Sequence, residues 1–156
     1  MYEKILLPTD GSEEAEQAVR HGLALAESMD ASVHALYVVP TGVTLPYSPG
    51  HLDEEGRNEA EEYGEEIVTE VVEMAKKAGI ESTGVVKRGT VYKEIVEYAA
   101  DNDFELLVMG TQGRSGLDEL VLGSTTEKVV RHSDVPVTAV RRSRFGDWGP
   151  GGPGRG

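Results

Sequence analysis

Two apolar patterns alternate along the chain, and together they predict an alternation of strands and helices. Short continuous apolar runs, bounded by Gly, Pro or polar residues, are typical of strands that are buried on both faces of a sheet. Such runs predict five strands, at residues 3–8, 33–40, 81–87, 104–109 and 135–140. Between them, apolar residues recur at helical spacing and predict four helices, at residues 12–29, 53–78, 91–100 and 124–132.

The βαβαβαβαβ order of these elements predicts an α/β fold. Strands that alternate with helices require right-handed crossovers, which give an open five-stranded parallel sheet with helices on both faces. In such a sheet a ligand binds at the carboxyl ends of the strands, where the strand order reverses. We assign residues 1–142 to one domain. We expect residues 143–156, which are rich in Gly and Pro and have no core pattern, to be a disordered tail.

Charge and composition narrow the possible partners. The formal net charge of -13 arises from 15 Lys and Arg against 28 Asp and Glu, and such a surface repels nucleic-acid backbones. The acidity is consistent either with simple solubility or with adaptation to high salt, where self-repulsion is screened. No apolar run approaches the length of a membrane span. We therefore expect a soluble cytoplasmic protein with no nucleic-acid or membrane partner.

Candidate chemistry is concentrated in a glycine-rich loop between the fourth predicted strand and the fourth predicted helix. Gly110 and Gly113 follow the strand, and Gly123 directly precedes the helix. Glycines let backbone N–H groups approach an anion closely, and the first turn of a helix favours phosphate. Arg114 could add positive charge from the loop. From these residues alone, the alternatives of a phosphate site and of glycines that only shape turns remain equally open.

The polar cluster at the start of this helix supports both alternatives. The hydroxyl groups of Ser124 and Thr125 could donate hydrogen bonds to phosphate. The spacing from Ser124 to Glu127 also fits a capping box, which predicts Ser124 as the helix N-cap. The chain contains no Gly-Lys-Ser/Thr phosphate loop, no cysteine, no Ser-His-Asp arrangement and no metal-ligand spacing. We therefore predict neither catalytic residues nor a metal site on the protein.

The glycine spacing resembles that of a known family. Gly110 and Gly113, followed after nine residues by Gly123-Ser124, match the G-2x-G-9x-G-(S/T) motif of the universal stress protein family. The segment at 8–12, Gly89 and the segment at 134–137 are similar to that family as well. The resemblance covers residues 1–142 and identifies the chain as a UspA-like member of the ATP-binding branch. It implies a Rossmann-like sheet with strand order 3-2-1-4-5.

The resemblance also implies a ligand and a set of binding residues. The ligand is ATP, with Mg²⁺ bridging its phosphates. Asp10 would contact the nucleoside, Val38 would line the adenine pocket with Gly89 at its border, and the glycine loop would hold the phosphates and the ribose. For Asp10 and Val38 the alternatives are an ordinary turn residue and plain core. The implied binding residues are Pro8, Thr9, Asp10, Val38, Gly89, Met109, Gly110, Gly113, Arg114, Gly123, Ser124 and Thr125.

The resemblance implies a nucleotide-dependent stress-response sensor or switch with at most slow ATP hydrolysis. It further implies a homodimer that forms by antiparallel pairing of the strand at residues 135–140. Two alternatives stay open: a weak ATPase or nucleotidyl-transfer enzyme on the same scaffold, and a ligand-free interaction protein. Fold alone does not decide between them, because function depends on the site.

Overall fold

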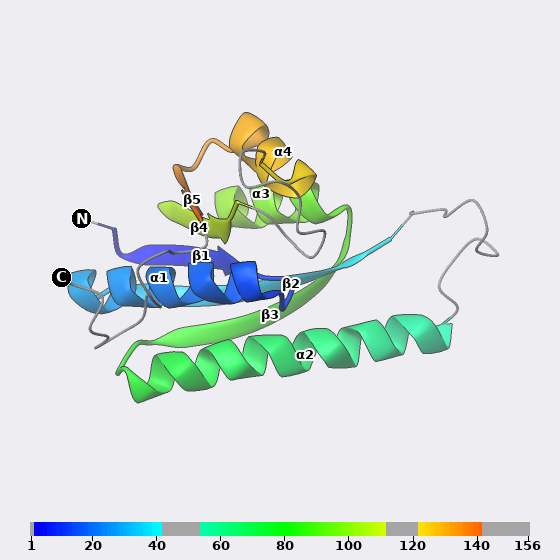
Figure 1. Ribbon diagram of the computed structural model, residues 1–156, viewed down its shortest axis with the longest axis horizontal. Helices are drawn as coiled ribbons and strands as arrows, with labels where there is room; N and C mark the ends of the chain where they lie inside the picture. Colours follow the sequence, from blue (N-terminus) through cyan, green and yellow to red (C-terminus); the bar gives the residue numbers. More distant parts are fainter. Residues whose placement is uncertain (1, 42–53, 112–121, 142–156) are drawn as a thin grey trace.

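The computed structural model describes residues 2–41, 54–111 and 122–141, and the predicted alternation of elements is confirmed within these ranges. The predicted tail, the loop around residues 42–53 and part of the glycine loop lie outside them. Figure 1 shows the elements in chain order. They are β1 (Lys4–Pro8), α1 (Glu13–Met29), β2 (Ser32–Pro40), α2 (Glu54–Lys77), β3 (Ser82–Gly89), α3 (Val91–Asp101), β4 (Leu106–Gly110), α4 (Ser124–His132) and β5 (Val137–Val140).

The five strands form one parallel sheet in the order β3-β2-β1-β4-β5, as predicted. From β1 the chain first builds outward through β2 and β3, and it then crosses back to place β4 on the other side of β1. The order therefore reverses between β1 and β4, which is where a ligand is expected in this fold. β5 begins later than the predicted residue 135, because the N–H of Val135 donates to Ser133 Oγ in a turn (3.0 Å) and Pro136 has no N–H.

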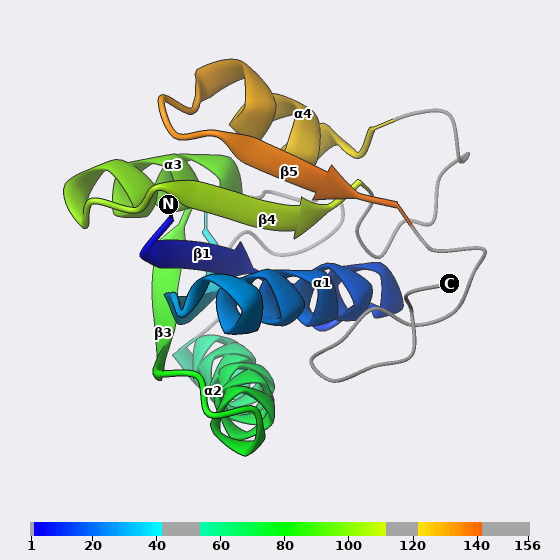
Figure 2. The same cartoon turned by 90° about the vertical axis from the view of Figure 1, so that its left-hand side faces the viewer.

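Two helices cover each face of the sheet, and Figure 2 shows the layers edge-on. α1 and α2 pack on one face, where the core contains Ala35 and Val108 among its buried residues. α3 and α4 pack on the other face, where Leu36 and Leu107 point into a second core cluster. Alternate residues of the same strand thus face opposite layers, which explains why the strands are continuous apolar runs.

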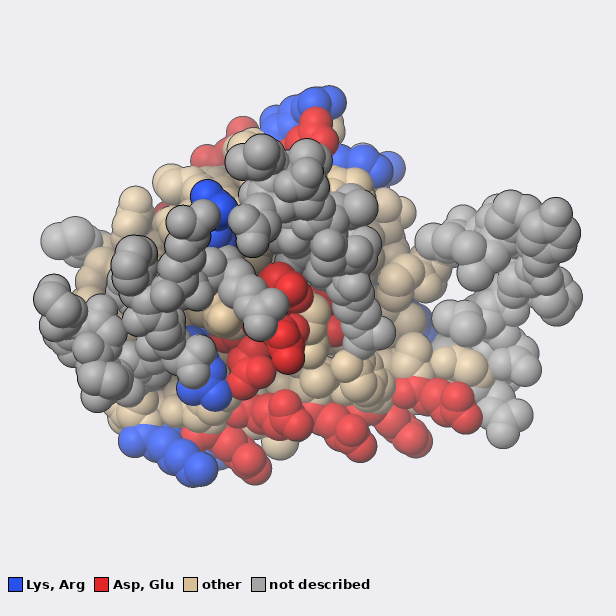
Figure 3. Space-filling view, in the orientation of Figure 1, with Lys and Arg blue, Asp and Glu red and all other residues tan. Residues whose placement is uncertain are grey.

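The acidic surface follows one helix. The solvent-facing side of α2 carries a row of exposed glutamates, which Figure 3 shows as a red band along the molecule. Within the described ranges, no helix is long and apolar enough to cross a lipid bilayer.

Candidate functional site

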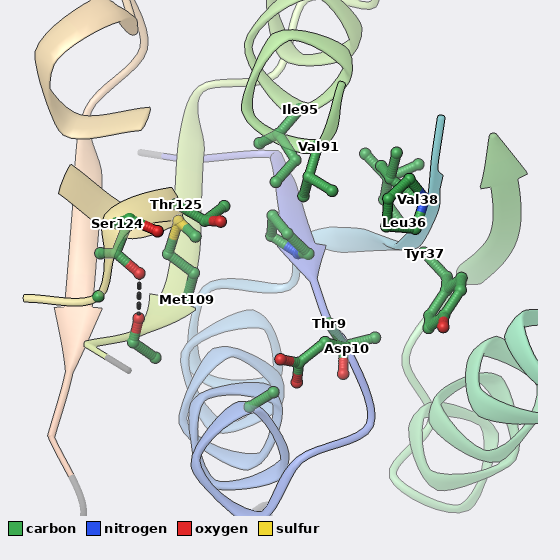
Figure 4. A pocket seen from close by; sticks show the side chains of 16 residues that line it. Thr9, Asp10, Leu36, Tyr37, Val38, Val91, Ile95, Met109, Ser124 and Thr125 are labelled. Atoms are coloured by element: carbon green, nitrogen blue, oxygen red, sulfur yellow. Dashed lines mark hydrogen bonds between the residues drawn. The ribbon is translucent and has the colours of Figure 1, made fainter. Parts of the chain in front are cut away.

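A cavity of about 330 Å³ opens at the carboxyl ends of β1, β2 and β4, beside the first turns of α3 and α4. This is the point at which the strand order reverses. Figure 4 shows side chains from these elements around it. Most of the residues implied by the glycine motif line this cavity, namely Pro8, Thr9, Asp10, Val38, Met109, Gly110, Gly123, Ser124 and Thr125.

One side of the cavity is apolar. Leu36 and Val38 come from β2, Val91 and Ile95 from the first turns of α3, and Met109 from β4. Figure 4 shows the two α3 side chains above the end of the sheet. The sequence does not mark Val91 and Ile95 as site residues, because their helical spacing indicates only that they face the core. A flat, largely apolar ring would fit such a surface.

The β1–α1 turn supplies the polar side of the cavity. The N–H of Ser12 donates to Asp10 Oδ1 (2.9 Å), and the N–H of Gly11 donates to Thr9 Oγ1 (3.1 Å). Ser12 caps α1, since its Oγ accepts from the N–H of Ala15 (3.1 Å). Asp10 is therefore a turn residue that also lines the cavity. It is the only charged residue among those described as lining the cavity.

The start of α4 differs from the prediction. The N-cap is Gly123, with φ -59° and ψ 153°, and Ser124 is the first helical residue. No side chain caps this helix end, so the predicted capping box with Ser124 as N-cap is wrong. Glu127 forms an ion pair with Arg131 instead (2.6 Å). A residue with helical dihedral angles does not direct its side chain to the N–H groups of its own first turn as an N-cap does.

This arrangement leaves hydrogen-bond donors of the first turn of α4 beside the cavity. The first N–H groups of an α-helix have no acceptor within the helix, and the helix dipole favours negative charge beside them. The hydroxyl groups of Ser124 and Thr125, which line the cavity, add further donors. The phosphate end of a ligand would therefore meet neutral donors at α4, with no cationic side chain among the described lining residues.

Two hydrogen bonds join the end of β4 to the start of α4. Thr126 Oγ1 donates to the carbonyl oxygen of Gly110 (2.7 Å), which is the dashed line in Figure 4. The N–H of Gly123 donates to the carbonyl oxygen of Thr111 (2.7 Å). We call this pair of contacts the β4–α4 neck. The sequence does not mark Thr126 as a site residue, because only the structure shows that its hydroxyl is buried against β4.

The remaining predicted site residues are not placed at the cavity. Gly89 ends β3 and is not among the lining residues. It has φ +152°, and a Cβ there would lie 2.5 Å from Glu94 Oε1, so glycine is required for the turn into α3. Gly113 and Arg114 lie outside the described residues. Within residues 2–41, 54–111 and 122–141, no group of three or more His, Asp or Glu side chains could hold a metal ion.

Comparison with known proteins agrees with this architecture. Residues 1–141 match the model of the universal stress protein family. The chain belongs to this family. Universal stress protein MJ0531 of Methanocaldococcus jannaschii is 35% identical over 149 residues, which cover 92% of this chain and 85% of the relative. Universal stress protein YxiE of Bacillus subtilis is 32% identical, with 90% of this chain and 100% of the relative covered.

A solved structure of a universal stress protein in complex with cAMP superposes with a TM-score of 0.69 and 26% identity, covering 91% of this chain and 99% of that one. The structure of protein MJ0577 superposes with a TM-score of 0.75 and 27% identity, covering 92% of this chain and 98% of that one. The family resemblance and the strand order drawn from the sequence are thus confirmed.

Proposed function

We propose that this universal stress protein binds ATP in the cavity between β1, β2 and β4 and acts in the cytoplasm as a nucleotide-dependent sensor or switch. The observation that carries the proposal is the placement of an apolar surface, a carboxylate and an uncapped helix N-terminus around one cavity. These are the three environments that a base, a ribose and a phosphate chain require. A family neighbour solved with cAMP supports an adenine nucleotide as the ligand class.

The apolar surface would hold the adenine ring. Val91 and Ile95 of α3 and Met109 of β4 approach the cavity from two sides, and Val38 comes from β2. Burial of a ring between aliphatic side chains is favourable without a charge partner. Asp10 would accept a hydrogen bond from a ribose hydroxyl, which is a bond that a carboxylate makes strongly.

The α4 N-terminus would hold the phosphates. Because the described lining residues include no Lys or Arg, the phosphate charge would be balanced by the helix dipole, by neutral donors and by Mg²⁺. Mg²⁺ bound to phosphate oxygens and water needs few protein ligands. We expect ATP hydrolysis to be slow at most, since Asp10 is the only carboxylate in the described lining that could act as a base, and it belongs to the nucleoside side.

The family expectation of a homodimer is part of the proposal. β5 is an outer strand of the sheet; Val137 and Thr138 are only partly buried, and Ala139 is exposed. An unpaired strand edge favours pairing with another chain. We propose that two copies pair antiparallel along residues 135–140. Sedimentation in solution should give about twice the 16.8 kDa mass of one chain, and a monomer mass at working concentration would contradict it.

Isothermal titration with ATP, ADP and adenosine, each with and without Mg²⁺, tests the nucleotide proposal. We expect saturable 1:1 binding of ATP that Mg²⁺ strengthens. The variant Ser124→Asp places a negative charge at the first helical position, where it favours the helix but repels phosphate. It should lose ATP affinity while retaining adenosine affinity.

A matched control is Thr69→Asp, which adds the same charge at an exposed position of α2 away from the cavity. It should bind ATP as the wild type does. Wild-type protein that takes up neither ATP nor ADP in the presence of Mg²⁺ would contradict the proposed function.

A further inference from the structure

We propose that Thr126 is a positioning residue, whose hydroxyl fixes the N-terminus of α4 against the end of β4 and thereby sets the place of the phosphate donors. This inference rests on the proposed function, because it assigns a role within the same nucleotide site. Thr126 is only 4% exposed and is the buried polar side chain among the described residues. Its hydroxyl has a defined partner sixteen residues away, the carbonyl oxygen of Gly110 at 2.7 Å.

The carbonyl group that accepts this bond lies at the carboxyl end of the sheet, beside the cavity. Gly110 is the last residue of β4, and β4 adjoins the place where the strand order reverses. β4 is itself held on both sides, by β1 and by β5. Gly110 itself pairs with Val140 of β5, so a bond to its carbonyl group ties α4 to the end of the sheet rather than to a surface loop.

The second bond of the β4–α4 neck differs from the Thr126 bond because it involves no side chain. The N–H of Gly123 donates to the carbonyl oxygen of Thr111 at 2.7 Å, and the N–H of Thr111 donates to the carbonyl oxygen of Val140 at 3.0 Å. Both of these bonds join backbone atoms, so they can form with almost any side chains. The Thr126 bond is the one contact of the neck that depends on a side-chain hydroxyl.

Two attachments are needed to fix the direction of a short helix. α4 has nine residues, and the Gly123 bond holds only one point at its start. The Thr126 bond holds the helix one residue past Thr125, on the side that faces β4. With both bonds present, the first turn is fixed in position and in rotation. Val129 anchors the middle of α4 in the core, so with the backbone bond alone we expect only the first turn to shift.

Rotation of the first turn of α4 would weaken binding of the phosphates more than binding of the nucleoside. Hydrogen bonds weaken steeply outside a narrow range of distance and angle, and the helix dipole acts only within the first turn. Donors for phosphate would therefore be misplaced by a small rotation of α4. The side chains of the apolar surface and of the Asp10 turn come from elements other than α4, so we expect the nucleoside part of the site to remain intact when only the first turn of α4 shifts.

The alternative is that Thr126 only satisfies a buried carbonyl group and contributes to stability alone. A stability role would weaken every ligand equally or none of them. A positioning role would weaken ATP and leave adenosine unchanged. The ratio of the two dissociation constants therefore separates the alternatives, whereas a melting temperature does not.

The variant Thr126→Val keeps the shape of the side chain and removes the hydroxyl. We expect its ATP dissociation constant, measured by isothermal titration with Mg²⁺, to rise about tenfold, which corresponds to ~1.4 kcal/mol. Its adenosine dissociation constant should stay within about twofold of the wild-type value, a difference of under ~0.5 kcal/mol. Thr126→Ser restores the hydroxyl and should recover most of the ATP affinity.

Ser133→Ala is the matched control at the other end of the same helix. The Ser133 hydroxyl donates to the carbonyl oxygen of Val135 (2.7 Å) and accepts from its N–H (3.0 Å), far from the cavity. This variant should lower stability but keep the wild-type ratio of ATP to adenosine affinity. If Thr126→Val does not fold, as circular dichroism would reveal, Thr126→Ala takes its place, and the same change in ratio is expected.

The outcomes separate this inference from the function on which it rests. Wild-type protein that binds no nucleotide overturns both. Wild-type protein that binds ATP, with an unchanged ratio in Thr126→Val or in its replacement, overturns the positioning role alone. An equal loss for both ligands, or the same change of ratio in Ser133→Ala, also overturns it, because each would indicate a general effect on α4.

Discussion

At the β1–α1 turn, the side-chain hydrogen bonds join residues that are at most three positions apart, whereas at the β4–α4 neck the hydrogen bonds join residues that are separated by more than ten. The turn consists of Thr9, Asp10 and Ser12 side chains that accept from nearby N–H groups. The neck consists of the Thr126 and Gly123 bonds to the end of β4. Both line the same cavity. The side-chain bonds of the β1–α1 turn thus depend on residues that are close in sequence, whereas the β4–α4 neck depends on how α4 packs against β4.

The turn also depends on the layer beneath it at one position. Gly11 has φ +80°, and a Cβ there would lie 2.7 Å from Tyr63 Oη and 2.9 Å from Ile67 Cδ1 of α2. The residue next to Asp10 therefore needs glycine both for its backbone conformation and for the space that α2 leaves. Side-chain hydrogen bonds between near neighbours shape the turn, and α2 limits the size of the residue at position 11.

Among the variants considered, Gly11→Ala is expected to lower the free energy of unfolding the most. A left-handed conformation costs a non-glycine residue about 1–2 kcal/mol, and overpacking against α2 costs roughly 1–3 kcal/mol more. Gly79→Ala is the control, since Gly79 has φ +75° but nothing within 4 Å of an added Cβ. Urea unfolding should show a loss for Gly11→Ala that exceeds the loss for Gly79→Ala by the packing cost. Equal losses would mean that α2 does not restrict the turn.

A second variant compares the two sides of the site by ligand. Asp10→Asn keeps an oxygen for the N–H of Ser12 and removes the charge, so the turn should survive. Because a charge-assisted hydrogen bond is replaced by a neutral one, ATP and adenosine affinity should both fall about threefold to tenfold. This pattern contrasts with Thr126→Val, for which only ATP affinity falls. A selective loss of ATP in Asp10→Asn would contradict the assignment of Asp10 to the nucleoside.

A third comparison uses the two serines that open helices beside the cavity. Ser12→Ala removes a working N-cap and should cost about 1 kcal/mol in the free energy of unfolding. Ser124→Ala removes a hydroxyl that caps nothing, so the cost should stay within about 0.5 kcal/mol. Thermal or urea unfolding measures both. A larger loss for Ser124→Ala would restore the capping interpretation that the structure contradicts.

The smallest effect on stability is expected at His34, near the amino end of β2 and far from both the β1–α1 turn and the β4–α4 neck. Burial, and secondly the charge of Lys4, lower the pKa of His34 below its usual value. Its Nδ1 lies 2.8 Å from Tyr98 Oη. The folded state therefore disfavours protonation of His34. Its contribution to the free energy of unfolding is fully present at neutral pH and decreases as the pH falls below the unfolded pKa of about 6.5.

Urea midpoints between pH 7.5 and pH 5 measure this dependence. His34→Gln should reduce the pH dependence but not abolish it, because burial also lowers the pKa of His21. The ratio of ATP to adenosine affinity should be unchanged in His34→Gln, which lies outside the cavity lining. An altered ratio would show that the amino end of the sheet influences the site.

Sequence alone determined much of this molecule. The spacing of apolar residues predicted the order of strands and helices, and the glycine spacing predicted the family. The cap of α1 is local in the same way, because Ser12 Oγ accepts from the N–H of a residue three positions along the chain. Strand and helix order and helix caps depend on residues that are close together in the sequence, so a local sequence pattern can predict them.

Only the tertiary structure decided the other side of the site. The same three-residue spacing at Ser124 predicted a capping box, yet α4 begins at Ser124 itself and its N-cap is Gly123. Thr126 and Ile95 reached the cavity although their spacing marked them only as helix residues. The physical reason is distance along the chain: the start of α4 is determined by bonds to β4, and no local pattern specifies which carbonyl group a distant hydroxyl will meet.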